Sequence, residues 1–155
     1  MLTAKAKYGI KAMIYLAGSY RGNWAQAGEI ADTQQIPRQF LGNILSELRM
    51  AGLVHSKKGK GGGYFLSRPP AQISIGEIIR VLDGPLMPMA CASRLDYRPC
   101  SDCEEEAHCR VRAVMLQVRE TTARVLDNTS LLLMMPPGDG PIVLNRRVSG
   151  QALPA

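Results

Sequence analysis

Aromatic side chains and long apolar runs are both scarce in this sequence. Aromatic residues make up 5% of the 155 residues, with a single Trp and two Phe, which argues against a large β-sandwich and favours a mainly helical chain. No apolar run approaches the roughly 18 residues needed to cross a bilayer. The first residues lack the apolar core of a signal peptide, so we expect a cytoplasmic protein without a membrane partner.

Negative charge is also scarce in the first half of the chain. Residues 1–68 hold ten Lys and Arg against three Asp and Glu, whereas residues 69–155 hold nine against ten. A basic N-terminal half suggests a polyanionic partner for that half, although charge alone is equally consistent with ordinary solubility.

Residues 1–68 are predicted to form a winged helix-turn-helix domain. Apolar residues at helical spacing indicate helices over 3–19, 27–34 and 38–51, with a tight turn at Ile36-Pro37 before the third. Strands are then expected over 53–56 and 64–67, joined by the glycine-rich and basic segment 57–63. Two short helices followed by a hairpin are the element order of a winged helix-turn-helix.

The second half is predicted to contain a connecting segment, a loop and one long helix. A short helix over 75–82 lies in the connecting segment 69–85, and the cysteine-rich segment 86–110 has no periodicity. A helix over 111–135 shows a heptad-like seam, and residues 136–155 are expected to be a disordered tail. The seam favours pairing with a second copy over packing on its own domain; its members are Val111, Met115, Val118, Thr122, Val125, Thr129 and Leu132. The predicted fold is therefore mainly α with a small β-hairpin, ending in a long dimerisation helix.

Two groups of residues are candidates for contact with DNA. The polar face of the third helix offers side chains that pair with guanine or adenine in the major groove, namely Arg38, Gln39, Asn43 and Ser46. The hairpin tip offers Lys57, Lys58 and Lys60 to phosphate, with Gly62 allowing close backbone approach. The alternative is a solvated helix face and an ordinary basic turn. A phosphate-binding loop is disfavoured, because Gly-Lys-Ser/Thr and a following helix are both missing.

Four cysteines within nineteen residues form a candidate metal site: Cys91, Cys100, Cys103 and Cys109. A cytosolic chain is not expected to keep structural disulfides, and clustered thiolates hold iron–sulfur clusters or zinc. Neighbouring acidic residues would raise thiol pKa values, and His108 is expected to be a solvated loop residue rather than a ligand. A dithiol oxidoreductase built on Cys100 and Cys103 is disfavoured, because no strand-to-helix context surrounds them.

The sequence resembles the bacterial winged-helix regulators typified by IscR, NsrR, RirA and CymR. The resemblance covers about residues 1–134 and is concentrated in segments 2–8, 36–41, 45–49, 52–66, 75–79 and 126–131. Its most specific part is the run from Gly52 to Leu66, with its Gly-Lys-Gly-Gly-Gly-Tyr-Phe-Leu sequence.

The resemblance implies a homodimer with a cysteine loop that binds an iron–sulfur cluster, either 2Fe–2S or 4Fe–4S. Three cysteines usually ligate in this family, and Cys91, Cys103 and Cys109 match them; Cys100 is an extra that either adds a fourth ligand or replaces Cys103. Two positions depart from the family pattern. Arg112 stands where some members have a ligating His, and Gly42 stands where some have a specificity-setting Glu.

The chain is therefore interpreted as a transcriptional regulator and not as an enzyme. We expect a repressor that binds a double-stranded DNA operator and senses cluster status, iron, or redox or nitric oxide stress. The alternative is a cluster-free regulator of the same fold, which uses its cysteines as thiol sensors or zinc ligands or is controlled by a partner protein.

Overall fold

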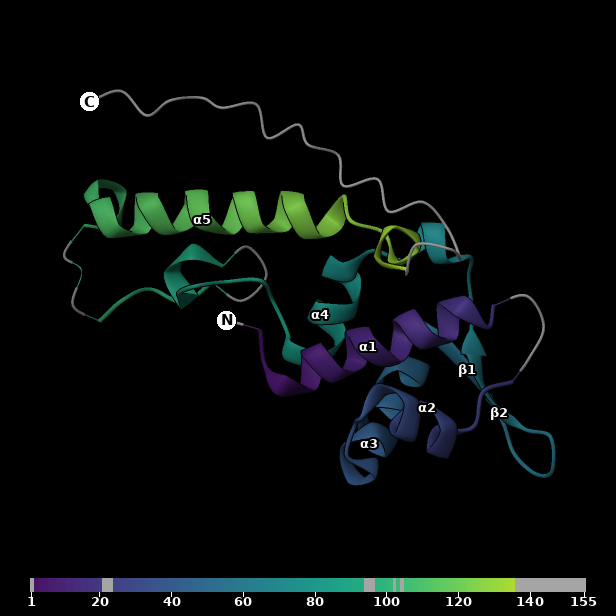
Figure 1. Cartoon of the computed structure of the whole chain (residues 1–155). Coiled ribbons are helices and arrows are strands. Elements are labelled where there is room, and N and C mark those ends of the chain that lie inside the picture. Colours follow the sequence, from purple (N-terminus) through teal and green to yellow (C-terminus); the bar gives the residue numbers. More distant parts are fainter. Residues whose placement is uncertain (1, 21–23, 94–96, 102, 104, 136–155) are drawn as a thin grey trace.

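The computed structural model describes residues 2–20, 24–93, 97–101, 103 and 105–135, and the tail predicted over 136–155 lies outside them. A compact N-terminal unit of three helices and a hairpin lies beside a fourth helix, against which a long fifth helix packs and extends well beyond the unit (Figure 1). The elements in chain order are α1 (Ala4–Gly18), α2 (Ala27–Gln34), α3 (Arg38–Met50), β1 (Val54–Lys57), β2 (Gly63–Leu66), η1 (Pro70–Gln72), α4 (Ile75–Asp83), η2 (Ala90–Ala92), η3 (Glu106–His108), α5 (Arg110–Asp127) and η4 (Leu131–Met134).

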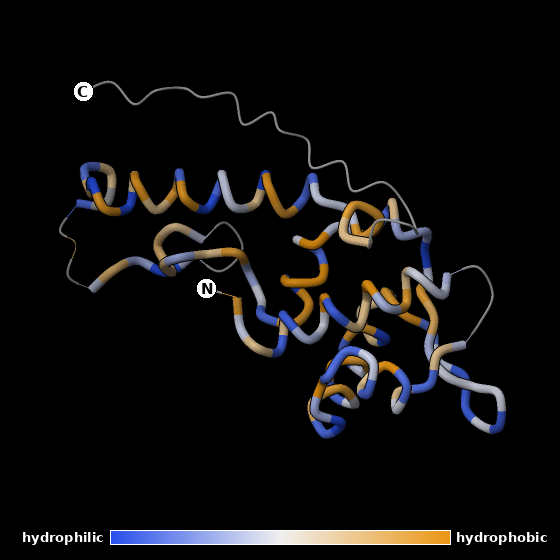
Figure 2. Tube along the Cα trace, in the orientation of Figure 1, coloured by the Kyte–Doolittle hydropathy of each residue, from blue (hydrophilic) through white to orange (hydrophobic). Residues whose placement is uncertain are grey.

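Helix α1 is the central element of the core. Thr3 caps it, because its hydroxyl accepts the backbone N–H of Ala6 at 3.2 Å. Its small residues let neighbouring helices approach closely: a Cβ on Gly9 would collide with Leu82 of α4. Buried apolar residues of the helices and the hairpin form one core cluster, and the trace through these elements has many orange segments (Figure 2).

The turn between α2 and α3 fixes the helix-turn-helix geometry. Gln35 adopts the left-handed conformation with φ 53°, and the N–H of Ile36 reaches back to the carbonyl of Ala31 at 2.9 Å. Pro37 is the N-cap of α3, which buries Leu41, Ile44, Leu45 and Leu48. One face of α3 is thereby pressed into the core and the opposite face is left to solvent.

The hairpin pairs β1 and β2 antiparallel, with Val54 opposite Leu66 and Lys57 opposite Gly63. Ala25, just before α2, pairs with Tyr64 through two backbone hydrogen bonds of 3.0 and 2.8 Å. Gly63 permits this approach, because a Cβ there would meet the backbone of Ala25. The hairpin is thus tied to the helix-turn-helix by backbone bonds as well as by the chain. The sequence analysis placed Lys57 in the hairpin tip, whereas in the structure it is the last residue of β1.

The long helix is shorter than the pattern predicted. Helix α5 ends at Asp127, and the residues beyond it return to the core. The side chains of Asn128 and Thr129 bond to carbonyls of the last turn at 2.7 Å each, and such local bonds compete with helix propagation. Leu131 then donates its N–H to Ile73 at 2.8 Å and is fully buried. The prediction that Thr129 and Leu132 continue the helical seam is therefore wrong.

The remaining architecture agrees with the prediction of a mainly helical chain with one small antiparallel hairpin. Within the part of the chain that the structure describes, no helix combines the length and apolarity required to traverse a membrane.

Candidate nucleic-acid interface and cysteine site

The exposed face of α3 presents two amide side chains in one row. Gln39 and Asn43 are exposed and one helical turn apart, and Ser46, one turn further, is half-buried. Met50 continues the same row and is 74% exposed. The sequence analysis missed Met50, although the spacing 39, 43, 46, 50 places it on this face.

Arg38 lies at the edge of that face and already has a partner. Its Nη2 contacts both carboxylate oxygens of Asp32, on α2, at 2.9 and 3.0 Å. Both side chains are exposed, at 72% and 67%, so the pair is weak and competes with water or phosphate. To contact DNA, the Arg38 guanidinium would therefore have to share or exchange its bonds with the Asp32 carboxylate.

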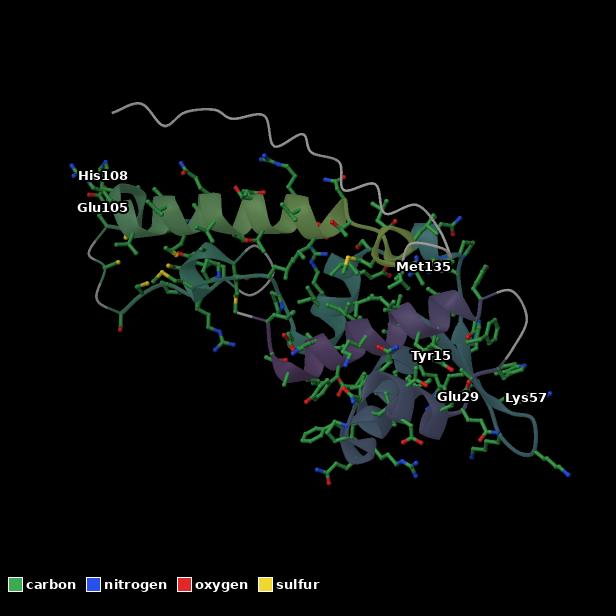
Figure 3. All side chains as sticks on the ribbon, viewed as in Figure 1. Tyr15, Glu29, Lys57, Glu105, His108 and Met135 are labelled. Atoms are coloured by element: carbon green, nitrogen blue, oxygen red, sulfur yellow. The ribbon has the colours of Figure 1, made fainter. Side chains whose placement is uncertain are left out.

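The wing presents three exposed lysines on one side of the molecule: Lys57, Lys58 and Lys60. Lys57 points away from the core at the end of β1 (Figure 3). Its Nζ lies 6.0 Å from the centre of the Trp24 ring, a distance at the limit of a cation–π contact.

Gly62 does not lie at the surface of the wing as the sequence analysis supposed. It is buried, its N–H donates to the Gly59 carbonyl at 3.0 Å, and a Cβ there would strike the carbonyl of Lys57. Gly62 thus permits the tight turn and is not itself exposed for contact.

An aromatic group beneath the wing was also missed. The rings of Trp24 and Phe65 meet edge to face at 4.7 Å, and His55 lies 5.1 Å from Phe65. The hairpin register places His55 opposite Phe65, and the pairing of Ala25 with Tyr64 brings Trp24 to the same ring. They stiffen the base of the wing that carries the lysines.

The four cysteines lie in a row at the start of α5. Cys91 is buried in η2, and Cys109 is the N-cap of α5, its sulfur accepting the backbone N–H of Arg112 at 3.4 Å. The sulfurs of Cys103 and Cys109 are 4.0 Å apart. Cys100 interacts with both Cys91 and Cys103, which completes the row. Sulfur atoms gather between this end of α5 and the segment beneath it (Figure 3).

Two thiols of this row, Cys100 and Cys109, differ in acidity. A hydrogen bond with Cys91, together with burial and neighbouring thiols, raises the pKa of Cys100 to about 12. The backbone N–H of Arg112, with Cys103 and the Arg112 charge, lowers the pKa of Cys109 despite burial. Cys109 is therefore more acidic than Cys100.

The donor chemistry fits a thiolate-bound group, although the side chains are not closed around one point. Among the described residues, no three Cys, His, Asp or Glu side chains are close enough together to hold a metal ion as they stand. Four neighbouring soft sulfur donors nevertheless suit an iron–sulfur cluster or zinc. His108 faces Glu105 instead, with Nδ1 and Oε2 2.9 Å apart on exposed side chains.

Helix α5 exposes an apolar stripe along its length. No residue of α5 is buried, and Val111, Val114, Val118 and Val125 are 57%, 52%, 45% and 55% exposed. Met115, which the sequence analysis assigned to this seam, is half-buried. A cavity of about 650 Å³ adjoins the stripe, between α5, α4 and the start of α1; its lining includes Leu2, Ile10, Ile79, Val118, Arg119 and Leu126.

Comparison with known proteins identifies the kind of molecule that carries these surfaces. An Rrf2-like regulator of the helix-turn-helix type from Rhodobacter capsulatus is 42% identical over 90% of this chain and 95% of its own length. The structure of CymR, the global cysteine regulator of B. subtilis, has a TM-score of 0.69 and 35% identity over 84% of this chain and 92% of CymR. T. potens IscR has a TM-score of 0.65 and 30% identity over 84% of this chain and 82% of IscR.

These similarities confirm the winged helix-turn-helix fold and the interpretation as a DNA-binding regulator rather than an enzyme. The family model that matches residues 2–137 is Rrf2, described as an iron-dependent transcriptional regulator. The chain belongs to the Rrf2 family of transcriptional regulators.

Proposed function

We propose that this protein is a cytoplasmic repressor that binds a double-stranded DNA operator as a homodimer and is controlled by an iron–sulfur cluster held on its cysteines. The observation that carries the proposal is the row of four neighbouring thiols at the start of the helix that exposes an apolar stripe. A sensor at one end of a dimerisation helix can alter the spacing of two DNA-binding units.

DNA docking follows from the two exposed surfaces of the winged helix. Helix α3 enters the major groove, where the amides of Gln39 and Asn43 pair with adenine edges and Arg38 pairs with guanine or phosphate. The wing lysines contact phosphates, which position the protein without reading sequence. Two copies related by a two-fold axis would read half-sites roughly 34 Å apart.

The apolar stripe of α5 supports pairing with a second copy. Four exposed valines on one helix are unfavourable in water, and burying them is worth about 25 cal/mol per Å².

Sedimentation velocity tests the dimer. We expect a dimer for the unmodified protein and a monomer for Val118→Lys, since a charge in the stripe would be buried unpaired. Arg124→Ala, an exposed change on the same helix, is the matched control and should remain dimeric. A dimeric Val118→Lys would move the interface away from α5.

Cys91, Cys103 and Cys109 would hold the cluster, and Cys100 would supply the fourth thiolate. When bound, such a cluster provides an electron-accepting group that oxidants, nitric oxide or iron shortage can alter or remove. The protein supplies partly buried thiols and the positive end of α5, which favours the negative charge of thiolates.

Three contacts link the end of α5 opposite the cysteines to α3. Helix α5 is bound to α4 by the pair between Arg80 and Asp127. The end of α4 holds the start of α1, because Leu82 accepts a bond from Lys5 at 2.9 Å. The same ammonium contacts Glu47 of α3 at 2.7 Å. A shift of α5 on cluster loss would thereby reach the helix that reads DNA.

A thiol switch between Cys103 and Cys109 is the second candidate. Their sulfurs are neighbours at 4.0 Å, and a small movement of the loop would bring them to the S–S bond length of about 2 Å. Hydrogen peroxide would oxidise the two thiols to one disulfide and be reduced to two waters. A related structure is that of CymR from Staphylococcus aureus in an oxidised form.

Anaerobic purification with iron and acid-labile sulfide assays separates the two candidates. Visible absorption with iron and sulfide in stoichiometric amounts supports the cluster, and single Cys→Ser variants then rank the four ligands. Colourless protein without iron or sulfide, even after reconstitution, eliminates the cluster. Loss of two free thiols on peroxide treatment, prevented by Cys103→Ser, would then support the switch, and bound zinc would support a structural metal.

A further inference from the structure

We propose that Arg112 is a positioning residue that preassembles the cysteine site by holding Cys91 against the start of α5. Its Nε–H donates to the backbone carbonyl of Cys91 at 2.9 Å. Its backbone N–H donates to the sulfur of Cys109 at 3.4 Å. One residue therefore contacts both the first and the last cysteine of the set.

The sequence separation explains why such a connection is needed. Cys91 and Cys109 are eighteen positions apart, and the segment between them contains only a single 3-10 turn, η3, among its described residues. Ordering a loop of this length costs conformational entropy. The hydrogen bond from Arg112 of α5 to the Cys91 carbonyl fixes the first ligand of the loop to a rigid helix, and this bond needs no metal.

The chemistry of the side chain suits this position. The guanidinium stays protonated, is planar, and is the cation most able to keep a hydrogen bond in a partly buried setting. The bond to Cys91 is made through Nε, and the charge of the same guanidinium helps to lower the pKa of Cys109. Four thiolates carry four negative charges, and a fixed positive charge next to them offsets part of their repulsion.

Two separable consequences follow. The bond to Cys91 holds the loop closed, whether or not a cluster is present. The charge favours the more negative, reduced state of a bound cluster, and this second consequence depends on the proposed function.

The test compares Arg112→Gln and Arg112→Lys with Arg110→Gln. Arg110 is the first residue of α5 and is exposed, so its loss removes a charge near the site without the bond to Cys91. Iodoacetamide labelling of Cys91, followed by mass spectrometry on metal-free protein, measures how often the loop opens. Cys91 is 3% exposed, so labelling requires opening.

We expect Arg112→Gln to label at Cys91 about tenfold faster than the unmodified protein, with a matching increase in the rate at which a chelator removes iron from the reconstituted protein; this size is typical of lost support around metal ligands. Its midpoint potential should be more negative. Arg112→Lys should keep the potential while still labelling faster, and Arg110→Gln should change neither labelling nor iron loss.

Equal Cys91 labelling in Arg112→Gln and Arg110→Gln would overturn the positioning role, with or without iron. An unchanged potential in Arg112→Gln would remove the role of the charge. If the unmodified protein takes up no iron and sulfide, the proposed cluster fails, and the labelling comparison still decides whether Arg112 holds Cys91.

Discussion

Arg80 of α4 and Asp127, the last residue of α5, form a two-pronged ion pair. Nη1 and Nη2 lie 2.7 and 2.8 Å from the two carboxylate oxygens. The hydrogen bond from Arg80 lowers the pKa of Asp127, and the same bond raises the pKa of Arg80. Fork-to-fork geometry fixes direction as well as distance, so this pair sets the angle at which α5 leaves the winged helix.

Replacing Asp127 with Asn should loosen that joint. The groups are 35% and 44% exposed, so we expect a loss of only about 0.5–1 kcal/mol in the free energy of unfolding at pH 7. The measurement is urea unfolding followed by circular dichroism, with Asp32→Asn as a matched control on a more exposed pair. A loss no larger than that of the control would show that the two-pronged geometry adds nothing.

The stability lost in Asp127→Asn should depend on pH. Because the pKa of Asp127 is lower in the folded than in the unfolded protein, its contribution is complete above the unfolded pKa of about 3.9 and disappears as pH falls through the folded value. The difference in stability between the unmodified protein and Asp127→Asn should therefore be constant from pH 5 to 7 and shrink below pH 4. A difference that persists at pH 2 would assign the effect to packing.

Gly76 lies directly under this pair. A Cβ at Gly76 would collide with Oδ1 of Asp127 and approach Nη1 of Arg80 at 3.0 Å. Gly76→Ala should therefore destabilise the protein by about 1–3 kcal/mol, although alanine is the better helix former. Gly28 is also the second residue of its helix and has open space around it among the described residues, so Gly28→Ala should be neutral or stabilising. Equal changes in melting temperature for Gly76→Ala and Gly28→Ala would refute the packing argument.

Lys58→Ala should weaken binding to every DNA sequence alike. Loss of one phosphate contact lowers the slope of log affinity against log salt by about one. Fluorescence anisotropy with operator and scrambled duplexes at several salt concentrations measures it. Arg110→Ala, at the start of α5, removes the same charge far from the wing and should leave the slope unchanged (Figure 1). An unaltered slope in Lys58→Ala removes this lysine from the interface.

Asn43→Ala should change sequence preference instead of general affinity. An exposed amide in the middle of the α3 face is placed to pair with a base, and its loss should cost about 1–3 kcal/mol at one base position. Competition against single-base operator variants locates that position. Arg38→Ala should have a smaller effect, because Arg38 is already paired with Asp32. Unchanged preference in both variants would assign base reading to other residues.

Periodicity was sufficient to predict the helices of the N-terminal half and the hairpin. Leu41, Ile44, Leu45 and Leu48 are all buried, as their spacing in α3 requires. Periodicity failed at the end of α5, where Thr129 and Leu132 continue the spacing but not the helix. Side-chain bonds from Asn128 and Thr129 and the burial of Leu131 in the core outweigh local helix preference there.

The sequence likewise predicted some features of the candidate sites and missed others. The sequence identified the donor types in the cysteine segment, because four thiols so close together have few other uses. It did not indicate that Gly62 would be buried or that Met50 would extend the exposed face of α3. The bond of Arg112 to the Cys91 carbonyl was also unpredictable, since it joins a helix to a segment without periodicity.

The sequence by itself determined the element types, the basic N-terminal half and the presence of four soft ligands, because these depend on residue identity and on spacing along the chain. The tertiary structure decided which groups meet: Asp127 with Arg80, Arg112 with Cys91, and Cys103 with Cys109. These partners are between six and 47 positions apart. Contacts at such separations depend on how whole helices and loops pack, and local spacing carries no information about that packing.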